Sequence, residues 1–112
     1  MTPTSDTNHA VSLSTCANAD QAQALARTLL ERQLVACVNV VPGVRSYYRW
    51  KGAIEEDGEF LLIMKTRIDA ISRLKETLLE AHPYDVPAFV VLDVKDGSAD
   101  YLGWIDENVN GS

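Results

Sequence analysis

The chain has 112 residues, of which 46% are hydrophobic and 23% are charged, as expected for one globular domain with a sizeable core. Its formal net charge of −6 argues against a nucleic-acid partner, because phosphates require a basic surface. It has no run of about 20 apolar residues and no signal peptide at its polar start, so we expect a cytoplasmic protein with reduced cysteines and no membrane contact.

We expect residues 1–8 to form a disordered tail before a single domain that covers residues 9–112. Weak alternation of apolar and polar side chains predicts a strand over residues 9–16. Asn18 then offers a helix N-cap, with Gln21 at the third helical position as in a capping box. The apolar residues that follow at helical spacing predict one buried helix face: Ala22, Leu25, Ala26, Leu29 and Leu30.

Two unusually long strands are predicted between Leu34 and Thr66. An apolar run over residues 34–41 resumes after Pro42-Gly43 as residues 44–50, and residues 60–66 return. At about 3.3 Å per residue the first arm would reach roughly 50 Å, whereas a compact chain of this length is roughly 35 Å across. We therefore expect a ribbon that overhangs the domain unless it bends at Pro42-Gly43, and whose edges pair with other copies.

The predicted tip of this ribbon carries aromatic and charged side chains. Tyr47, Tyr48 and Trp50, next to Arg49, suggest an interface anchor, and a stacking surface for a ligand is the alternative. A polar turn region opens at residues 51–52. We interpret the acidic run behind it as a solvated loop without EF-hand spacing that could hold cations loosely: Glu55, Glu56, Asp57 and Glu59.

A second helix is predicted next, with Thr66 or Asp69 as its cap, and His82-Pro83 ends it because the residue before a proline leaves helical geometry. Its apolar face comprises Ile71, Leu74, Leu78 and Ala81. Residues 89–94 read as the last strand, and residues 96–98 form a turn. A short third helix follows, with Leu102, Ile105 and Val109 on one face.

The predicted order is β-α-β-β-α-β with a long central hairpin and an extra C-terminal helix. This order is that of an α+β, ferredoxin-like sandwich, in which an antiparallel sheet carries both main helices on one face. The fold alone specifies no function.

Few side chains could bind a metal ion. Cys16 ends the first strand and His82 ends the second helix, and a thiolate with an imidazole would suit copper or zinc. The alternatives are a cysteine that fills the core and a histidine that bonds a backbone carbonyl. We expect the two loops to lie at opposite ends of a protomer, so that these side chains would meet only across a subunit boundary.

The segment from Pro83 to Pro87 is stiff, and it presents Tyr84 and Asp85. It is either a fixed connection into the last strand or the floor of a site. In the second case Tyr84 and Asp85, with Lys65 and Arg49, would line a cleft for an anionic or polar ligand. The chain has no phosphate-binding glycine loop, HExxH or GxSxG motif, which argues against an enzyme.

Six blocks of the sequence, at residues 36–39, 41–43, 46–52, 64–66, 82–87 and 101–105, resemble the CutA family of divalent-cation tolerance proteins. The resemblance covers about residues 9 to 108. It implies a ferredoxin-like protomer, a tight homotrimer with a PII-like architecture, and a non-enzymatic role in tolerance to copper and other divalent ions. A PII-like sensor or structural scaffold that binds a small-molecule effector between subunits, or an unknown protein partner, is the alternative.

The resemblance also implies three copper ligands: a Cys near the end of the first strand, a His before the first proline of the stiff loop, and a Glu after the second. His82 matches directly. Cys16 lies two residues beyond the matching position, which Ser14 occupies, and Ala88 replaces the Glu. We therefore expect copper or another divalent cation to bind weakly, with no organic cofactor.

Overall fold

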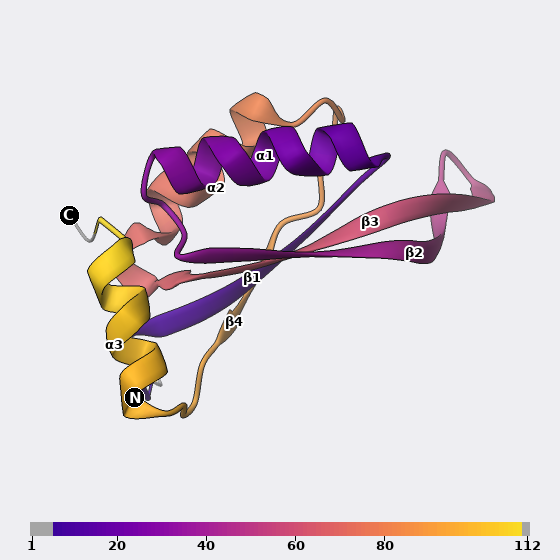
Figure 1. Cartoon of the computed structure of the whole chain (residues 1–112). Coiled ribbons are helices and arrows are strands. Elements are labelled where there is room, and N and C mark those ends of the chain that lie inside the picture. Colours follow the sequence, from indigo (N-terminus) through magenta and orange to yellow (C-terminus); the bar gives the residue numbers. More distant parts are fainter. Residues whose placement is uncertain (1–5, 111–112) are drawn as a thin grey trace.

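The computed structural model describes residues 6–110 (Figure 1). Its elements follow in this order: β1 (His9–Cys16), α1 (Ala19–Glu31), β2 (Cys37–Trp50), β3 (Ala53–Arg67), the 3₁₀ turn η1 (Ile68–Ala70), α2 (Ile71–Ala81), β4 (Val90–Asp93) and α3 (Ala99–Asn108). The strands form one antiparallel sheet in the order β2-β3-β1-β4. Both α1 and α2 lie on one face of it, which confirms the predicted ferredoxin-like α+β fold.

Helix α1 begins where the sequence predicts it. The Asn18 side chain accepts a hydrogen bond from the Gln21 N–H at 2.9 Å, and the Gln21 side chain accepts one from the Ala17 N–H at 2.9 Å. Two backbone donors at the helix start are satisfied in this way.

Helix α2 begins differently from the prediction. The Thr66 hydroxyl donates to the carbonyl of Leu34 at 2.6 Å, and Asp69 pairs with Arg67 at 3.0 Å, so neither side chain caps the helix. The turn η1 leads into α2 instead. The end of α2 agrees with the prediction, because His82 adopts the extended conformation that a following proline favours.

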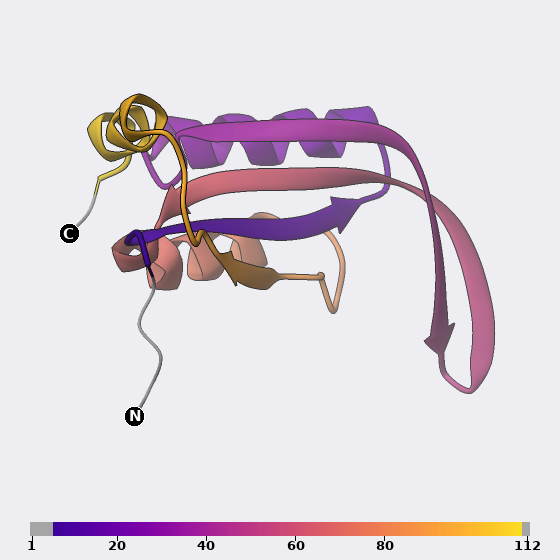
Figure 2. The same cartoon turned by 90° about the horizontal axis from the view of Figure 1, so that it is seen from below.

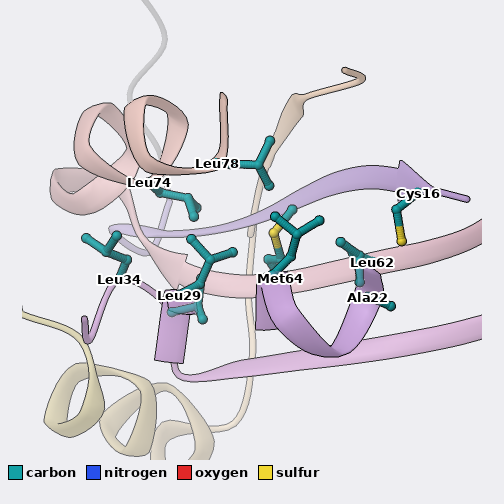
Figure 3. Packing of buried hydrophobic residues seen from close by; sticks show 10 residues of the cluster. Cys16, Ala22, Leu29, Leu34, Leu62, Met64, Leu74 and Leu78 are labelled. Atoms are coloured by element: carbon teal, nitrogen blue, oxygen red, sulfur yellow. The ribbon is translucent and has the colours of Figure 1, made fainter. Parts of the chain in front are cut away.

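The main core fills the space between the helices and the sheet (Figure 3). Leu29 of α1, Leu62 and Met64 of β3, and Leu74 and Leu78 of α2 are fully buried there. The alternation of β3 sends Leu62 and Met64 to the helix side, while Ile63 between them faces the other way.

The opposite face of the sheet is apolar and largely uncovered, and we call it the open face. It comprises Val11, Leu13, Leu61, Ile63, Val90 and Leu92, as the register of the strands requires. Val90 is 53% exposed and Leu92 is 52% exposed.

Helix α3 covers only one end of the open face (Figure 1). Its residue Asp106 pairs with His9 at 2.9 Å and with Arg67 at 3.2 Å, both at that end of the sheet. The rest of the open face has no covering segment among residues 6–110.

The central hairpin extends beyond the body of the domain (Figure 2). We call residues 44–50 and 53–59, its distal part, the arm. The register of β2 and β3 shifts between Val41 and Val44, and Gly43 takes the positive φ of +74° that glycine tolerates. The radius of gyration of 14.8 Å exceeds the roughly 13 Å of a compact chain of this size. The overhang is thus confirmed, and the arm also bends at Pro42-Gly43.

The acidic run is not a solvated loop, so that interpretation was wrong. Lys51 and Gly52 have positive φ values of +48° and +82° and form a two-residue turn, so β3 already starts at Ala53. The acidic residues belong to β3 and lie opposite residues of β2 along the arm. One of them, Glu56, forms an ion pair with Arg45.

Of the tail predicted over residues 1–8, residues 1–5 lie outside the described part of the chain. Thr7 donates its hydroxyl to the carbonyl of Val94 at 2.6 Å. The carbonyl of Asn8 accepts the N–H of Ile68 at 2.9 Å. These two residues are attached to the domain.

Two neighbouring leucines on α2 test the core. Leu78→Ala removes a fully buried side chain and should lower the free energy of unfolding by about 2–5 kcal/mol. Leu79 is 45% exposed, so Leu79→Ala should change it by less than about 1 kcal/mol. Urea denaturation at one fixed protein concentration measures both, and equal losses would contradict this assignment of the core.

Candidate functional site

A pocket of about 590 Å³ lies between the arm and the loop that follows α2 (residues 82–89). Figure 2 shows the arm curving away from the sheet toward the side where this loop lies. The residues that line it include Ser46, Tyr48, Trp50, Asp57 and Glu59 from the arm, and Tyr84, Asp85, Val86 and Ala88 from the loop.

The arm contributes alternate residues to this pocket. Successive side chains of a strand point to opposite faces, so Tyr48 and Trp50 share the inner face with Ser46. Tyr47 and Arg49 point to the outer face, and neither lines the pocket.

The loop is linked to the arm by Tyr84. Its hydroxyl donates a hydrogen bond to the carboxylate of Glu59 at 2.8 Å, and Glu59 is only 9% exposed. Within the arm, the hydroxyl of Tyr48 donates to Asp57. Both tyrosines therefore orient carboxylates of the pocket.

These contacts hold the two phenols in the protonated form. Burial raises the pKa of Tyr84 well above its usual value, and the hydrogen bond to Glu59 raises it further. The hydrogen bond to Asp57 is the main cause that raises the pKa of Tyr48 to about 12. At neutral pH both side chains remain hydrogen-bond donors.

His82 uses both ring nitrogens inside the protomer. Its Nε2 lies 2.7 Å from the carbonyl oxygen of Thr15, and its Nδ1 accepts the N–H of Tyr84 at 3.1 Å. These partners assign the neutral tautomer with hydrogen on Nε2. The expectation that the loops after β1 and α2 lie at opposite ends was wrong, because His82 at the end of α2 reaches the carbonyl of Thr15 at the end of β1. The two loops therefore share one end of the protomer.

Cys16 lies in the main core. It is fully buried, and Figure 3 shows its sulfur pointing into the cluster beside Leu62. Burial raises the pKa of the Cys16 thiol, so the thiolate that binds metal ions is disfavoured.

The copper ligands that the resemblance implies do not form a preassembled centre. Ser14 is buried on the helix side of β1, and Ala88 lines the pocket without a ligating atom. Among residues 6–110, no group of three or more histidine, cysteine or acidic side chains is placed to hold a metal ion.

The residues that were expected to line one ligand cleft do not all lie together in the structure. Tyr84 and Asp85 line the pocket, but Lys65 lies far from it, with its Nζ 5.4 Å from the ring centroid of Tyr101 on α3. Sequence reasoning missed Asp57 and Glu59 as pocket residues. The two-residue turn at Lys51-Gly52 was the available signal, because it places the acidic run on a strand opposite the aromatic residues.

The model of a protein family described as CutA1 divalent ion tolerance protein matches residues 10–108 of the chain. The chain is 45% identical to the divalent-cation tolerance protein CutA of Thermus thermophilus over 88% of its own length and 95% of that protein. It spans less of the vertebrate relatives, 63% of the Xenopus laevis homologue and 52% of the mouse CutA protein.

Solved structures agree with this match. The crystal structure of CutA1 from Oryza sativa superposes with a TM-score of 0.90 at 38% identity, over 93% of this chain and 95% of that one. A structure described as the periplasmic divalent cation tolerance protein CutA of Archaeoglobus fulgidus gives 0.88 at 33% identity, over 91% and 99%. Within residues 6–110, no helix is both long and apolar enough to cross a membrane.

The raised pKa of Tyr84 predicts a loss of stability at alkaline pH. The stabilisation is complete below about pH 10, the ordinary tyrosine pKa, and it is lost as pH rises through the higher folded-state pKa. Tyr84→Phe should lower the free energy of unfolding by about 1 kcal/mol at neutral pH and show a smaller decline above about pH 10 than the wild type. Denaturation at a series of pH values measures this. Tyr47→Phe, on the outer face, should keep the wild-type decline, and an unchanged decline in Tyr84→Phe would contradict the assignment.

Proposed function

The chain belongs to the CutA1 family of divalent ion tolerance proteins, and we propose that it acts in divalent-cation tolerance as a homotrimer without catalytic activity. The observation that carries the proposal is the uncovered open face. An apolar sheet face that lacks a covering layer is stabilised by burial against another copy.

The sheet edges support the same assembly. Strands β2 and β4 are the two edges, and each leaves backbone donors and acceptors available for pairing with another chain. Because β2 continues into the overhanging arm, this edge strand extends beyond the body of its own domain. The number of three copies comes from the family resemblance, whereas the need for partner copies comes from the open face and the edges.

Tyr47 is the best-placed anchor of this interface in the arm. It is 65% exposed on the outer face, where a second copy can reach it. Tyr48 and Trp50 were expected to share this role, and as inner-face residues they would contribute to the interface where it borders the pocket.

For the metal itself, we propose weak binding with His82 as the first ligand and Cys16 as the second. Nδ1 of His82 can be offered to copper if it gives up the hydrogen bond from the Tyr84 N–H. Losing such a bond costs about 1 kcal/mol, or roughly a fivefold loss of affinity. Cys16 would contribute only after the core around it opens, which makes it the poorer ligand.

The pocket favours a second candidate function, a PII-like sensor or scaffold that binds a small effector. A concave site of this volume with a few convergent polar groups is typical of small-molecule sites. In the trimer such a pocket would lie in or beside a cleft between subunits.

The cytoplasmic compartment stays a prediction, which the two free cysteines support.

Matched leucine substitutions test the assembly. Leu92→Arg puts a charge on the open face and should convert the trimer into smaller species. Leu79→Arg, at similar exposure on the outer side of α2, should leave the trimer intact. Sedimentation velocity at micromolar concentration measures the oligomeric state of both variants. A stable, folded single-chain species of the unaltered protein would overturn the proposal.

The two histidines of the chain test the metal site. Adding Cu(II) to the purified protein should produce a weak visible absorption band that disappears in His82→Gln and persists in His9→Gln. Glutamine at position 82 retains an N–H that can reach the Thr15 carbonyl, which limits structural damage. A band that survives His82→Gln would exclude His82 as the ligand.

A further inference from the structure

We propose that the pocket beneath the arm binds a small organic ammonium ion, either a protonated amine or a quaternary ammonium. This inference rests on the second function proposed above, the small-molecule sensor, and it specifies the charge and chemical class of the effector. It narrows the anionic or polar ligand that the sequence suggested to a cationic one.

The charges that line the pocket have one sign. Asp57, Glu59 and Asp85 contribute three carboxyl groups, and no lysine, arginine or histidine of the described part of the chain lines the pocket. Lys65 and Arg49, the cations expected beside Tyr84, lie elsewhere. An anionic ligand would face like charges, whereas a cation is attracted.

The lining of the pocket also includes three aromatic side chains. Tyr48 and Trp50 come from the arm and Tyr84 from the loop. The faces of such rings attract organic cations, and tryptophan does so most strongly. The Nζ of Lys51 lies over the Trp50 ring, 6.0 Å from its centroid, so a ligand cation competes with this lysine for that ring. The apolar side chains of Val86 and Ala88 complete a surface that suits methyl or methylene groups.

A bare metal ion fits this pocket less well. Divalent cations require several oxygen, nitrogen or sulfur ligands within bonding distance of one point. The described residues contain no such group, so the three carboxyl groups of the pocket are not gathered at one point as a metal ion would require. A volume of about 590 Å³ leaves room for an ammonium group with an attached chain.

Glu59 is the central anionic group of this site. It is nine-tenths buried, and its Oε2 accepts the hydroxyl of Tyr84 at 2.8 Å. An ionised carboxylate has about four acceptor positions, so this one hydrogen bond leaves capacity for a ligand. The tyrosine link also holds the carboxylate in place before the ligand arrives, which lowers the entropy that binding must overcome.

The test uses the intrinsic fluorescence of the full chain. Its two tryptophans are Trp50, in the pocket, and Trp104 on α3, so Trp104→Phe leaves Trp50 as the sole reporter. Choline should change this fluorescence in a saturable way. Its uncharged carbon analogue, in which a tert-butyl group replaces trimethylammonium, should bind at least tenfold more weakly.

Two glutamates of the arm supply the matched variants. Glu59→Gln keeps an acceptor for Tyr84 but removes the charge, and it should weaken choline binding by roughly fivefold to tenfold. Glu56→Gln makes the same charge change on the outer face and should leave the affinity unchanged. Sedimentation of the same samples shows whether the trimer is intact.

The outcomes separate this inference from the assembly. No saturable response to choline, equal binding of the analogue, or unchanged binding by Glu59→Gln would overturn the ammonium site. If sedimentation still finds the trimer in that case, only the ligand proposal fails. A preference for choline that depends on Glu59 supports it, whatever the copper titration shows.

Discussion

The arm of β2 and β3 is governed by one constraint: a strand sends successive side chains to opposite faces, and beyond Val41 no helix within residues 6–110 covers either face. Each face of the arm is therefore free to make contacts other than packing against a helix. On the inner face Tyr48 and Trp50 meet the loop after α2 and form a pocket. On the outer face Tyr47 and the Arg45–Glu56 ion pair remain open to solvent or to another copy. The bend at Pro42-Gly43 decides how the inner face is turned toward the loop.

The loop after α2 shows how residues with metal-binding chemistry become structural. His82 connects Thr15 at the end of β1 to the backbone of Tyr84, and Tyr84 in turn binds Glu59 on the arm. These hydrogen bonds join three segments that are distant in the sequence and rigidify the floor of the pocket. A metal ion bound to His82 would compete with this network, whereas a ligand in the pocket would benefit from it. The family is named for divalent ions, whereas the pocket is lined by carboxyl groups and aromatic rings.

The sheet has two unlike faces. The helix side is a dense core of leucine and methionine, so the protomer folds around it. The open face also carries apolar side chains, but in the part of the chain that the structure describes it has no second layer apart from the end that α3 covers through Asp106. The helix side thus stabilises each chain, and in the proposed assembly the open face would supply the contact between copies.

The order of the elements, the start of α1 at Asn18, the end of α2 at His82 and the overhanging hairpin all follow from local rules, which is why the sequence alone predicted them. Capping, proline geometry and side-chain periodicity act over a few residues and can be read from neighbours in the chain. The blocks that resemble the CutA family likewise sufficed to place the chain in that family. The tertiary structure alone decided that Thr66 bonds Leu34, that Lys65 lies beside Tyr101, and that Glu59 meets Tyr84 across 25 positions of sequence. Such contacts depend on strand register and on how far the arm bends, and a single residue of register exchanges the inner face for the outer one.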